Sequence, residues 1–168
     1  MFFTMLWNPK DILHAQEPNS ANSKIKAIFM YNFTKYVEWP GNYHQGDFVI
    51  GILGATSLST ELEKMSQKCK VGLQPFKIMR YNNVTEIGKC HILYIANEKS
   101  SSLSSALTKV KNHSTLIVTE SEGLALKGSA INFVSVNSKQ RFELSKSNAG
   151  RYGLQVSSSL NALAIMID

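Results

Sequence analysis

The residues of this chain that could do chemistry are few, and the first group follows a short apolar stretch. The segment GILGATS (residues 51–57) places Gly51, Gly54 and two hydroxyl side chains between an expected strand and an expected helix. Backbone N–H groups at a helix start can bind phosphate. However, the segment lacks both the G-x-G-x-x-G pattern and the lysine of a P-loop. An ordinary strand-to-helix turn therefore accounts for it better.

Cys90 and His91 form a second group, because a cysteine beside a histidine suggests a nucleophile and its base. Both lie at the start of a predicted strand, where neighbouring side chains point to opposite faces. They therefore cannot form a hydrogen-bonded pair. The four histidines, at positions 14, 44, 91 and 113, lack the spacing of metal ligands. No acid–base pair or triad can be assembled, so the sequence predicts a non-enzymatic protein without cofactor or metal.

Arg141 and Glu143 are two residues apart in another predicted strand, so they share the face opposite Phe142 and Leu144. They form either a salt-linked edge or a recognition patch for a partner or ligand. Both interpretations stay open.

Composition restricts the class of protein. The chain has 168 residues, 43% of them hydrophobic, which is enough for one domain with a core. Its net charge of +6 comes from scattered Lys and Arg, of which only Lys64, Lys68 and Lys70 come close to clustering. Nucleic-acid-binding domains more often carry a basic stripe with interleaved aromatics. No segment is long and apolar enough for a transmembrane helix. We therefore expect neither nucleic-acid binding nor a membrane span.

The segment KAIFMYNFTKYVEWP (residues 26–40) predicts a helix over residues 24–38, with Ser23 as its cap. On a helical wheel the apolar side chains gather in one stripe. The members of this stripe are Ile25, Ile28, Phe29, Phe33 and Tyr36. We expect this stripe to face the core.

Asn32 falls near the centre of that stripe, where a buried amide bonded to loop backbone would clamp the helix to the sheet. Pro40 ends the helix, because a residue before proline avoids the α region. Trp39 then packs over the helix end or walls a small pocket.

Tyr31, Lys35 and Glu38 lie on the other side of the helix, close to Trp39. A tyrosine with flanking charges and an aromatic at the rim is typical of an interface hot spot. We expect this surface to bind a partner, with solvated side chains as the alternative.

Short apolar segments predict strands at residues 47–54, 74–81, 91–96 and 114–120. Helical spacing occurs in the intervening residues 57–68 and 100–110. A hairpin over residues 129–144 is indicated by two strand-like segments around a polar turn, and helical pieces follow near 145–151 and 157–165. This alternation predicts one three-layer α/β domain over residues 24–168. Its mostly parallel sheet would be covered by helices on both faces, with an antiparallel hairpin near the C-terminus.

The first 23 residues resemble the end of a secretory leader followed by a disordered stretch. An apolar pair and the small residue Ala15 precede a polar run, although NPKD (residues 8–11) interrupts the apolar part. We expect export, with residues 17–23 disordered.

Several segments together resemble the YfiR family of exported bacterial proteins. They are KAIFMYNFTKYVEWP, VIGILG, KCHILYIA, GSAINFV, RFELS and GLQVSSSLNALA, and they extend from about Lys24 to Ala164. The resemblance implies a non-enzymatic periplasmic regulator. Such a protein represses the periplasmic sensor region of an inner-membrane diguanylate cyclase, and so acts in cyclic-di-GMP signalling.

The chain departs from this family at one informative position. Some members pair the cysteine at the Cys90 position with one on the first strand, where Gly51 stands here. That redox link cannot form. The remaining candidate is a disulfide between Cys69 and Cys90, whose positions both precede predicted strands and so fall at the same edge of a parallel sheet.

Two classes of function follow. In the first, the domain binds the periplasmic domain of a membrane receptor. In the second, it is a small-ligand sensor acting with a sensor histidine kinase and using a pocket near Asn32, Trp39 and Gly54. The oligomeric state, including a homodimer, stays open.

The leader interpretation predicts a processed N-terminus. Protein isolated from its native host should begin between Gln16 and Ser23 when its N-terminus is sequenced. Recovery of protein that still begins at Met1 from the cytoplasm would contradict export.

Overall fold

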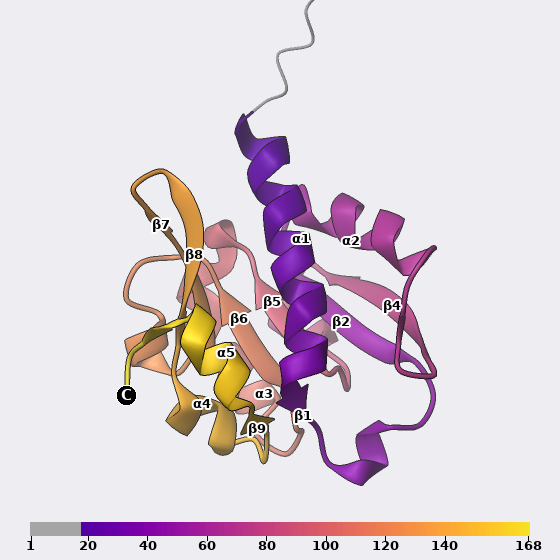
Figure 1. Cartoon of the computed structure of the whole chain (residues 1–168). Coiled ribbons are helices and arrows are strands. Elements are labelled where there is room, and N and C mark those ends of the chain that lie inside the picture. Colours follow the sequence, from indigo (N-terminus) through magenta and orange to yellow (C-terminus); the bar gives the residue numbers. More distant parts are fainter. Residues whose placement is uncertain (1–17) are drawn as a thin grey trace, which may run out of the picture.

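The computed structural model describes residues 18–168 and shows a mixed α/β fold with a curled, mostly parallel sheet (Figure 1). Eight strands follow the order β10-β8-β7-β6-β5-β2-β4-β3. The parallel part contains β4 (Gln74–Tyr81), β2 (Phe48–Leu53), β5 (Ile92–Ile95), β6 (Leu116–Thr119) and β7 (Ile131–Val136). The predicted mostly parallel α/β fold is thus confirmed.

The remaining strands are antiparallel or short. β8 (Lys139–Leu144) forms an antiparallel hairpin with β7, and β10 (Ile165–Met166) lies parallel to β8 on its outer side. The turn residues Asn137 and Ser138 both have positive φ, 50° and 61°, as a two-residue hairpin requires. The predicted hairpin is confirmed, but it is not at the edge of the sheet, because β10 pairs outside it. β3 (Lys70–Val71) pairs with β4.

A separate two-stranded sheet joins β1 (Val37–Glu38) to β9 (Gln155–Val156). It ties the end of the first helix to a segment more than a hundred residues later. The helices are α1 (Pro18–Tyr36), α2 (Leu58–Ser66), α3 (Leu103–Lys109), α4 (Lys146–Gly150) and α5 (Ser158–Leu163). Short 3-10 helices are η1 (Gly41–Tyr43), η2 (Val84–Glu86), η3 (Asn97–Ser102) and η4 (Ala125–Lys127).

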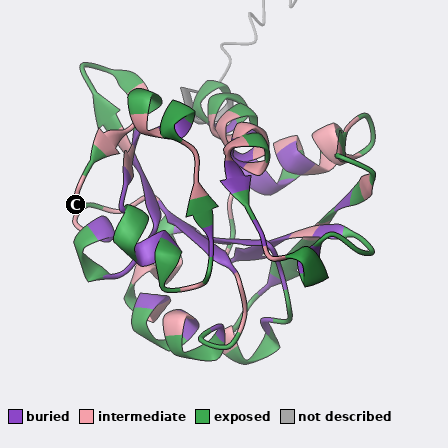
Figure 2. Cartoon of the chain, turned by 60° about the horizontal axis from the view of Figure 1, so that its bottom comes forward, coloured by how far each residue is buried: buried purple, intermediate pink, exposed green. Residues whose placement is uncertain are grey.

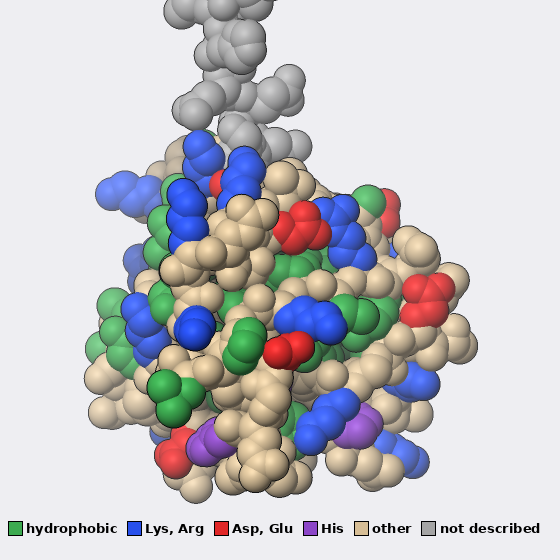
Figure 3. All heavy atoms as spheres, turned by 90° about the vertical axis from the view of Figure 1, so that its right-hand side faces the viewer, with side chains coloured by type: hydrophobic (Ala, Val, Ile, Leu, Met, Phe, Trp, Pro, Cys, Tyr) green, Lys and Arg blue, Asp and Glu red, His purple; other side chains and the backbone are tan. Residues whose placement is uncertain are grey.

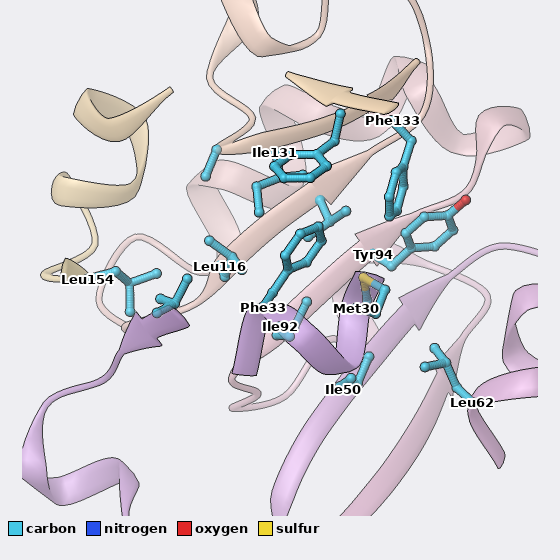
Figure 4. Close-up of a cluster of buried hydrophobic side chains, with 14 of the residues drawn as sticks. Met30, Phe33, Ile50, Leu62, Ile92, Tyr94, Leu116, Ile131, Phe133 and Leu154 are labelled. Atoms are coloured by element: carbon cyan, nitrogen blue, oxygen red, sulfur yellow. The ribbon is translucent and has the colours of Figure 1, made fainter. Parts of the chain in front are cut away.

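Two hydrophobic clusters line the two faces of the sheet. The larger lies beneath α1, α2 and α5 and includes Met30, Phe33 and Leu62, which lie among Ile50, Tyr94 and Phe133 (Figure 4). The smaller is covered by α3 and contains Leu103, Ala106 and Val110. Buried residues follow the strands and the inner sides of the helices, whereas the outer turns are exposed (Figure 2).

The predicted start and orientation of the first helix are wrong. α1 begins at Pro18 rather than residue 24, so Ser23 lies within it and residues 18–23 are helical. Proline suits the first turn of a helix, where its missing N–H costs nothing. The side chains that are buried are those of Ser23, Ala27, Met30 and Phe33. Ile25 and Ile28, expected in the core, are 41% and 54% exposed.

Four aromatic rings explain this orientation. Phe33 lies 5.1 Å from Phe142 and 6.0 Å from Phe133, and Phe29 lies 5.4 Å from Phe142, between ring centroids. Ala27, which is small and buried, lets α1 approach the sheet closely. The helix is therefore anchored to the hairpin β7–β8 by its phenylalanines, with the isoleucines outside.

This orientation predicts a sharp difference between two neighbouring truncations. Phe33→Ala should lower the free energy of unfolding by about 3 kcal/mol or more, because it leaves a cavity among buried rings. Ile28→Ala is the matched control on the same helix and should change it by less than about 0.5 kcal/mol. Urea denaturation of both variants measures the difference. A larger loss for Ile28→Ala would show that the helix is rotated as the sequence suggested.

Candidate functional site

Two hollows in the described part of the chain lie at the ends of α1, one at each end. The α1 C-terminal hollow, of about 660 Å³, lies between the segment 34–39, the β3–β4 turn and β9. The α1 N-terminal hollow, of about 810 Å³, lies between the first turns of α1, the loop 54–57 and the ends of β4 and β6. Both fall within the size range of ligand sites.

Three buried rings form the inner wall of the α1 C-terminal hollow. Trp39 is 5% exposed, and its ring lies 5.1 Å from Phe48 and 6.0 Å from His91 between centroids. Its indole N–H donates to the carbonyl of His91 at 3.1 Å. Trp39 therefore packs against Phe48 and His91 and lines a pocket, as one of its two interpretations expected.

His91 is held by backbone atoms from two other segments. Its Nδ1 accepts a hydrogen bond from the N–H of Val49 at 3.1 Å, and its Nε2 lies 2.8 Å from the carbonyl oxygen of Tyr43. This pattern assigns a neutral imidazole that carries its proton on Nε2. Burial lowers the pKa of His91, with further lowering by the charges of Lys89 and His44. His91 is therefore a neutral structural residue, stacked 4.1 Å from Phe48.

The rim of this hollow carries two of the residues expected to bind a partner. Lys35 and Glu38 line it and are exposed. Leu73, at the tip of the β3–β4 turn, also lines it and is 95% exposed. A single exposed leucine is ordinary on a protein surface, so only its place beside the hollow makes it a candidate contact.

Tyr31 does not face outward as expected. It is half-buried, its hydroxyl donates to the carbonyl of Lys70 at 3.0 Å, and its ring lies 6.2 Å from that of Phe76. The ammonium of Lys35 lies 4.7 Å from the ring centroid. Tyr31 thus packs α1 against the β3–β4 turn, and its role in binding stays a prediction.

Asn32, Arg141 and Glu143 do not join this surface. Asn32 is half-buried, so the fully buried amide expected at this position is not present. Arg141 is exposed, and its predicted salt link to Glu143 is not formed. Glu143 instead accepts a hydrogen bond from the side chain of buried Asn132 at 2.9 Å. Arg141 remains available as a recognition residue, whereas Glu143 is engaged within the fold.

The two cysteines are free thiols, so the candidate Cys69–Cys90 disulfide is not formed. Cys90 is fully buried, and burial raises the pKa of its thiol to about 12. A Cβ at Gly51 of β2 would lie 3.4 Å from the sulfur of Cys90, which precedes β5, so the two positions are close in space. Cys90 lies in the smaller cluster, whereas His91 stacks on Phe48 of the larger one, so the two side chains point to opposite faces as predicted.

The α1 N-terminal hollow is polar. The ammonium of Lys26 forms an ion pair with Glu120, which also accepts the N–H of Asn97 at 3.0 Å. Burial acts to raise the pKa of Glu120, but the hydrogen bond and charge of Lys26, with hydrogen bonds from Tyr94 and the N–H of Asn97, outweigh it and hold the pKa below its ordinary value. Gly54 lines this hollow, whereas Trp39 lines the other. A single pocket formed by Asn32, Trp39 and Gly54 is therefore wrong.

Surface charge, metal ligands and helix hydrophobicity bear on whether the described chain suits nucleic acid, a metal ion or a membrane. On the face formed by α2 and β4, basic and acidic side chains are interspersed (Figure 3), and Arg80 pairs with Glu63 at 2.8 Å. Within residues 18–168 no three His, Cys, Asp or Glu side chains gather as a metal site would require. None of the helices in this part of the chain could cross a bilayer.

Sequence reasoning missed the roles of His91 and of the Lys26–Glu120 pair. The partners of His91 are backbone atoms 42 and 48 residues away, which leave no pattern in the sequence. Lys26 and Glu120 are 94 residues apart. The one signal in the sequence is that Glu120 is the charged last residue of the apolar strand predicted at residues 114–120.

The lowered pKa of His91 predicts a loss of stability in mild acid. Below about pH 6.5 the unfolded chain binds a proton at His91 that the folded chain excludes, so the free energy of unfolding falls as the pH drops. Above that pH, His91 is neutral in both states and its full contribution to stability is present. Each unit of lowering corresponds to about 1.4 kcal/mol. Melting curves between neutral pH and mild acid should show a smaller decrease for His91→Gln than for the wild type. His113→Gln, at a half-buried site that does not contribute to the His91 pKa, should retain the wild-type slope; the same slope in His91→Gln would contradict the assignment.

Comparisons with known proteins agree with the fold and define the family. No curated protein matches the sequence significantly. The ABC domain from Streptococcus pneumonia in complex with L-Trp is similar in structure, with a TM-score of 0.57 and 13% sequence identity. The match covers 88% of this chain and 60% of that one, so the present chain corresponds to only part of it. A family model described as YfiR/HmsC-like matches residues 23–165. On this match, the chain belongs to the YfiR/HmsC-like family.

Proposed function

We propose that this protein is a non-enzymatic periplasmic regulator that binds and represses the periplasmic sensor region of an inner-membrane receptor of the diguanylate cyclase type. The observation that carries the proposal is the YfiR/HmsC-like match across residues 23–165, which spans nearly all of the described fold. The buried, neutral state of His91 and the buried thiol of Cys90 also support it, because neither group is available to act as a catalyst.

The rim of the α1 C-terminal hollow is the best candidate for the receptor interface. Trp39, Phe48 and His91 give it a rigid apolar wall, because each is buried and held by ring contacts. Exposed Lys35, Glu38 and Leu73 surround that wall. A well-packed centre that receives an apolar anchor, with charges at the rim, is the usual composition of an interface hot spot.

A second candidate function is a small-ligand sensor acting with a sensor histidine kinase. The same hollow supports it, since about 660 Å³ is sufficient for a small molecule and the wall combines aromatic rings with the polar groups of Gln74 and Ser157. L-Trp, the ligand of the ABC domain from Streptococcus pneumonia, is a suitable first probe. A rise in melting temperature with L-Trp, and no receptor recovered from membranes, would favour this function.

The interface proposal predicts that Leu73→Asp weakens receptor binding by roughly 30-fold, the effect of losing about 2 kcal/mol at a hot spot. The fold should tolerate the change, because Leu73 is 95% exposed. Leu126→Asp is the matched control, since Leu126 is 78% exposed and lies outside the hollow. Tagged protein would be used to recover the receptor from membranes of the native host, and affinity would then be measured with its purified periplasmic region.

Equal binding by Leu73→Asp and Leu126→Asp would place the interface elsewhere. Failure to recover any membrane receptor with the wild-type protein would contradict the regulator proposal itself. Tyr31→Ala is a poorer probe, because Tyr31 also holds α1 to the β3–β4 turn and its loss would affect stability.

A further inference from the structure

The outer border of the sheet at β4 is open over most of its length. β4 extends from Gln74 to Tyr81, but its outer neighbour β3 pairs only with Gln74 and Pro75. No described strand pairs with residues 76–81 on that side. This border is at the right of the sheet in Figure 1 and faces the viewer in Figure 3. An unpaired strand border is a template on which another chain can add a strand.

The hydrogen bonds to β2 show which backbone groups of β4 point outward. Gly54 donates its N–H to the carbonyl of Tyr81 at 3.0 Å, so the backbone groups of Tyr81 point inward, toward β2. Successive residues of a strand direct their N–H and C=O groups to alternate sides. The groups of Ile78 and Arg80 therefore point outward. None of the described residues forms a backbone hydrogen bond with them there.

Apolar side chains lie at this border on both faces of β4. Ile78 is half-buried and packs against the larger hydrophobic cluster. Met79 points to the opposite face and is 37% exposed. A methionine side chain is flexible and polarizable, so it adapts to the shape of a partner. A strand added at this border would have apolar surface to cover on each face.

Two lysines determine the charge of a segment that fits. Lys70 of β3 is opposite Pro75, and Lys77 is two residues further along β4, so both point to the same face of the sheet. Lys70 has no ion pair among the described residues. Lys77 contacts Asp47 at 3.9 Å, with the two side chains 55% and 45% exposed, and such a pair contributes little. A strand beginning where β3 ends would place a side chain beside both lysines.

A second copy of this chain is a poor occupant of the border. The open segment FKIMRY (residues 76–81) contains two cations and no acid, so two such borders would bring like charges together. Arg80 is already paired with Glu63 at 2.8 Å, which leaves Lys77 and Lys70 as the cations to be matched. Charged residues on an edge strand discourage pairing between identical chains. The same charges favour a partner strand that carries acids.

We propose that the open border of β4 binds an extended acidic segment of another protein, which adds as a strand beside residues 76–81. The outward groups of Ile78 and Arg80 supply its backbone hydrogen bonds, and Lys77 and Lys70 select acidic side chains. These residues do not line the α1 C-terminal hollow, so this surface is separate from the candidate receptor interface.

The test uses the ¹⁵N-labelled full chain with a synthetic peptide of alternating valine and glutamate. A peptide of alternating valine and lysine, of the same length, is the counterpart. In the free protein, the amides of Ile78 and Arg80 should exchange with solvent quickly, whereas those of Lys77 and Met79 should exchange slowly because they bond to β2. Saturating acidic peptide should slow exchange at Ile78 and Arg80 by roughly tenfold or more, since both become donors to the added strand.

Two variants separate the charge from the backbone contribution. Lys77→Glu should weaken binding of the acidic peptide by roughly tenfold, because it places like charges opposite each other. Lys111→Glu is its matched control, since Lys111 is exposed and lies outside β4. Arg80→Pro removes an outward N–H, which an edge strand tolerates, and should abolish binding. Arg80→Gln loses the same side chain but keeps the N–H, and should bind like the wild type.

Three results would overturn the proposal. The first is equal affinity for the two peptides or no saturable binding of the acidic one. The second is binding that leaves exchange at Ile78 and Arg80 unchanged. The third is slow exchange at these two amides in the free protein that increases with protein concentration, because a second copy would then cover the border.

Discussion

The packing of α1 across one face of the sheet is the constraint on which both candidate sites depend. The ring centroid of Phe33 lies within 6.0 Å of those of Phe133 and Phe142, and these contacts fix the rotation and position of the helix. The helix has 19 residues, so its ends are roughly 28 Å apart. One end lies at the carboxyl edge of the strands and the other at their amino edge (Figure 1). The two hollows are thus separate sites that share one rigid element.

His91 plays a comparable structural role at the amino edge of the sheet. A single side chain and its carbonyl join β5 to Val49 of β2, to Tyr43 of η1 and to Trp39. The segment that leaves α1 is therefore held against the sheet by polar contacts as well as by ring packing. The buried aromatic wall can therefore lie directly beneath exposed side chains. The wall is fixed by the sheet behind it, whereas the rim is exposed to solvent.

The sequence was sufficient where local pattern determines structure and insufficient where distant contacts do. Apolar runs identified β2, β4, β5 and β6, and the polar turn at Asn137 identified the hairpin. The orientation of α1 could not be predicted, because two apolar stripes share Phe33 and only the rings of β7 and β8 select between them. Likewise, the burial of Tyr31 depends on Lys70 of β3 and Phe76 of β4, about forty residues away in the sequence.

The environment of Cys90 bears on how this protein can receive a signal. A redox-sensing cysteine is an accessible thiol of low pKa with a second cysteine nearby. Cys90 is fully buried, its pKa is raised to about 12, and its neighbour on β2 is Gly51. Oxidation at this position would first require the buried thiol to become exposed to solvent. If other members of the family respond to redox changes through this pair of strands, this chain has lost that input while keeping the scaffold. Under the proposed function, a signal would then reach this protein through binding, for which the α1 C-terminal hollow is the candidate place.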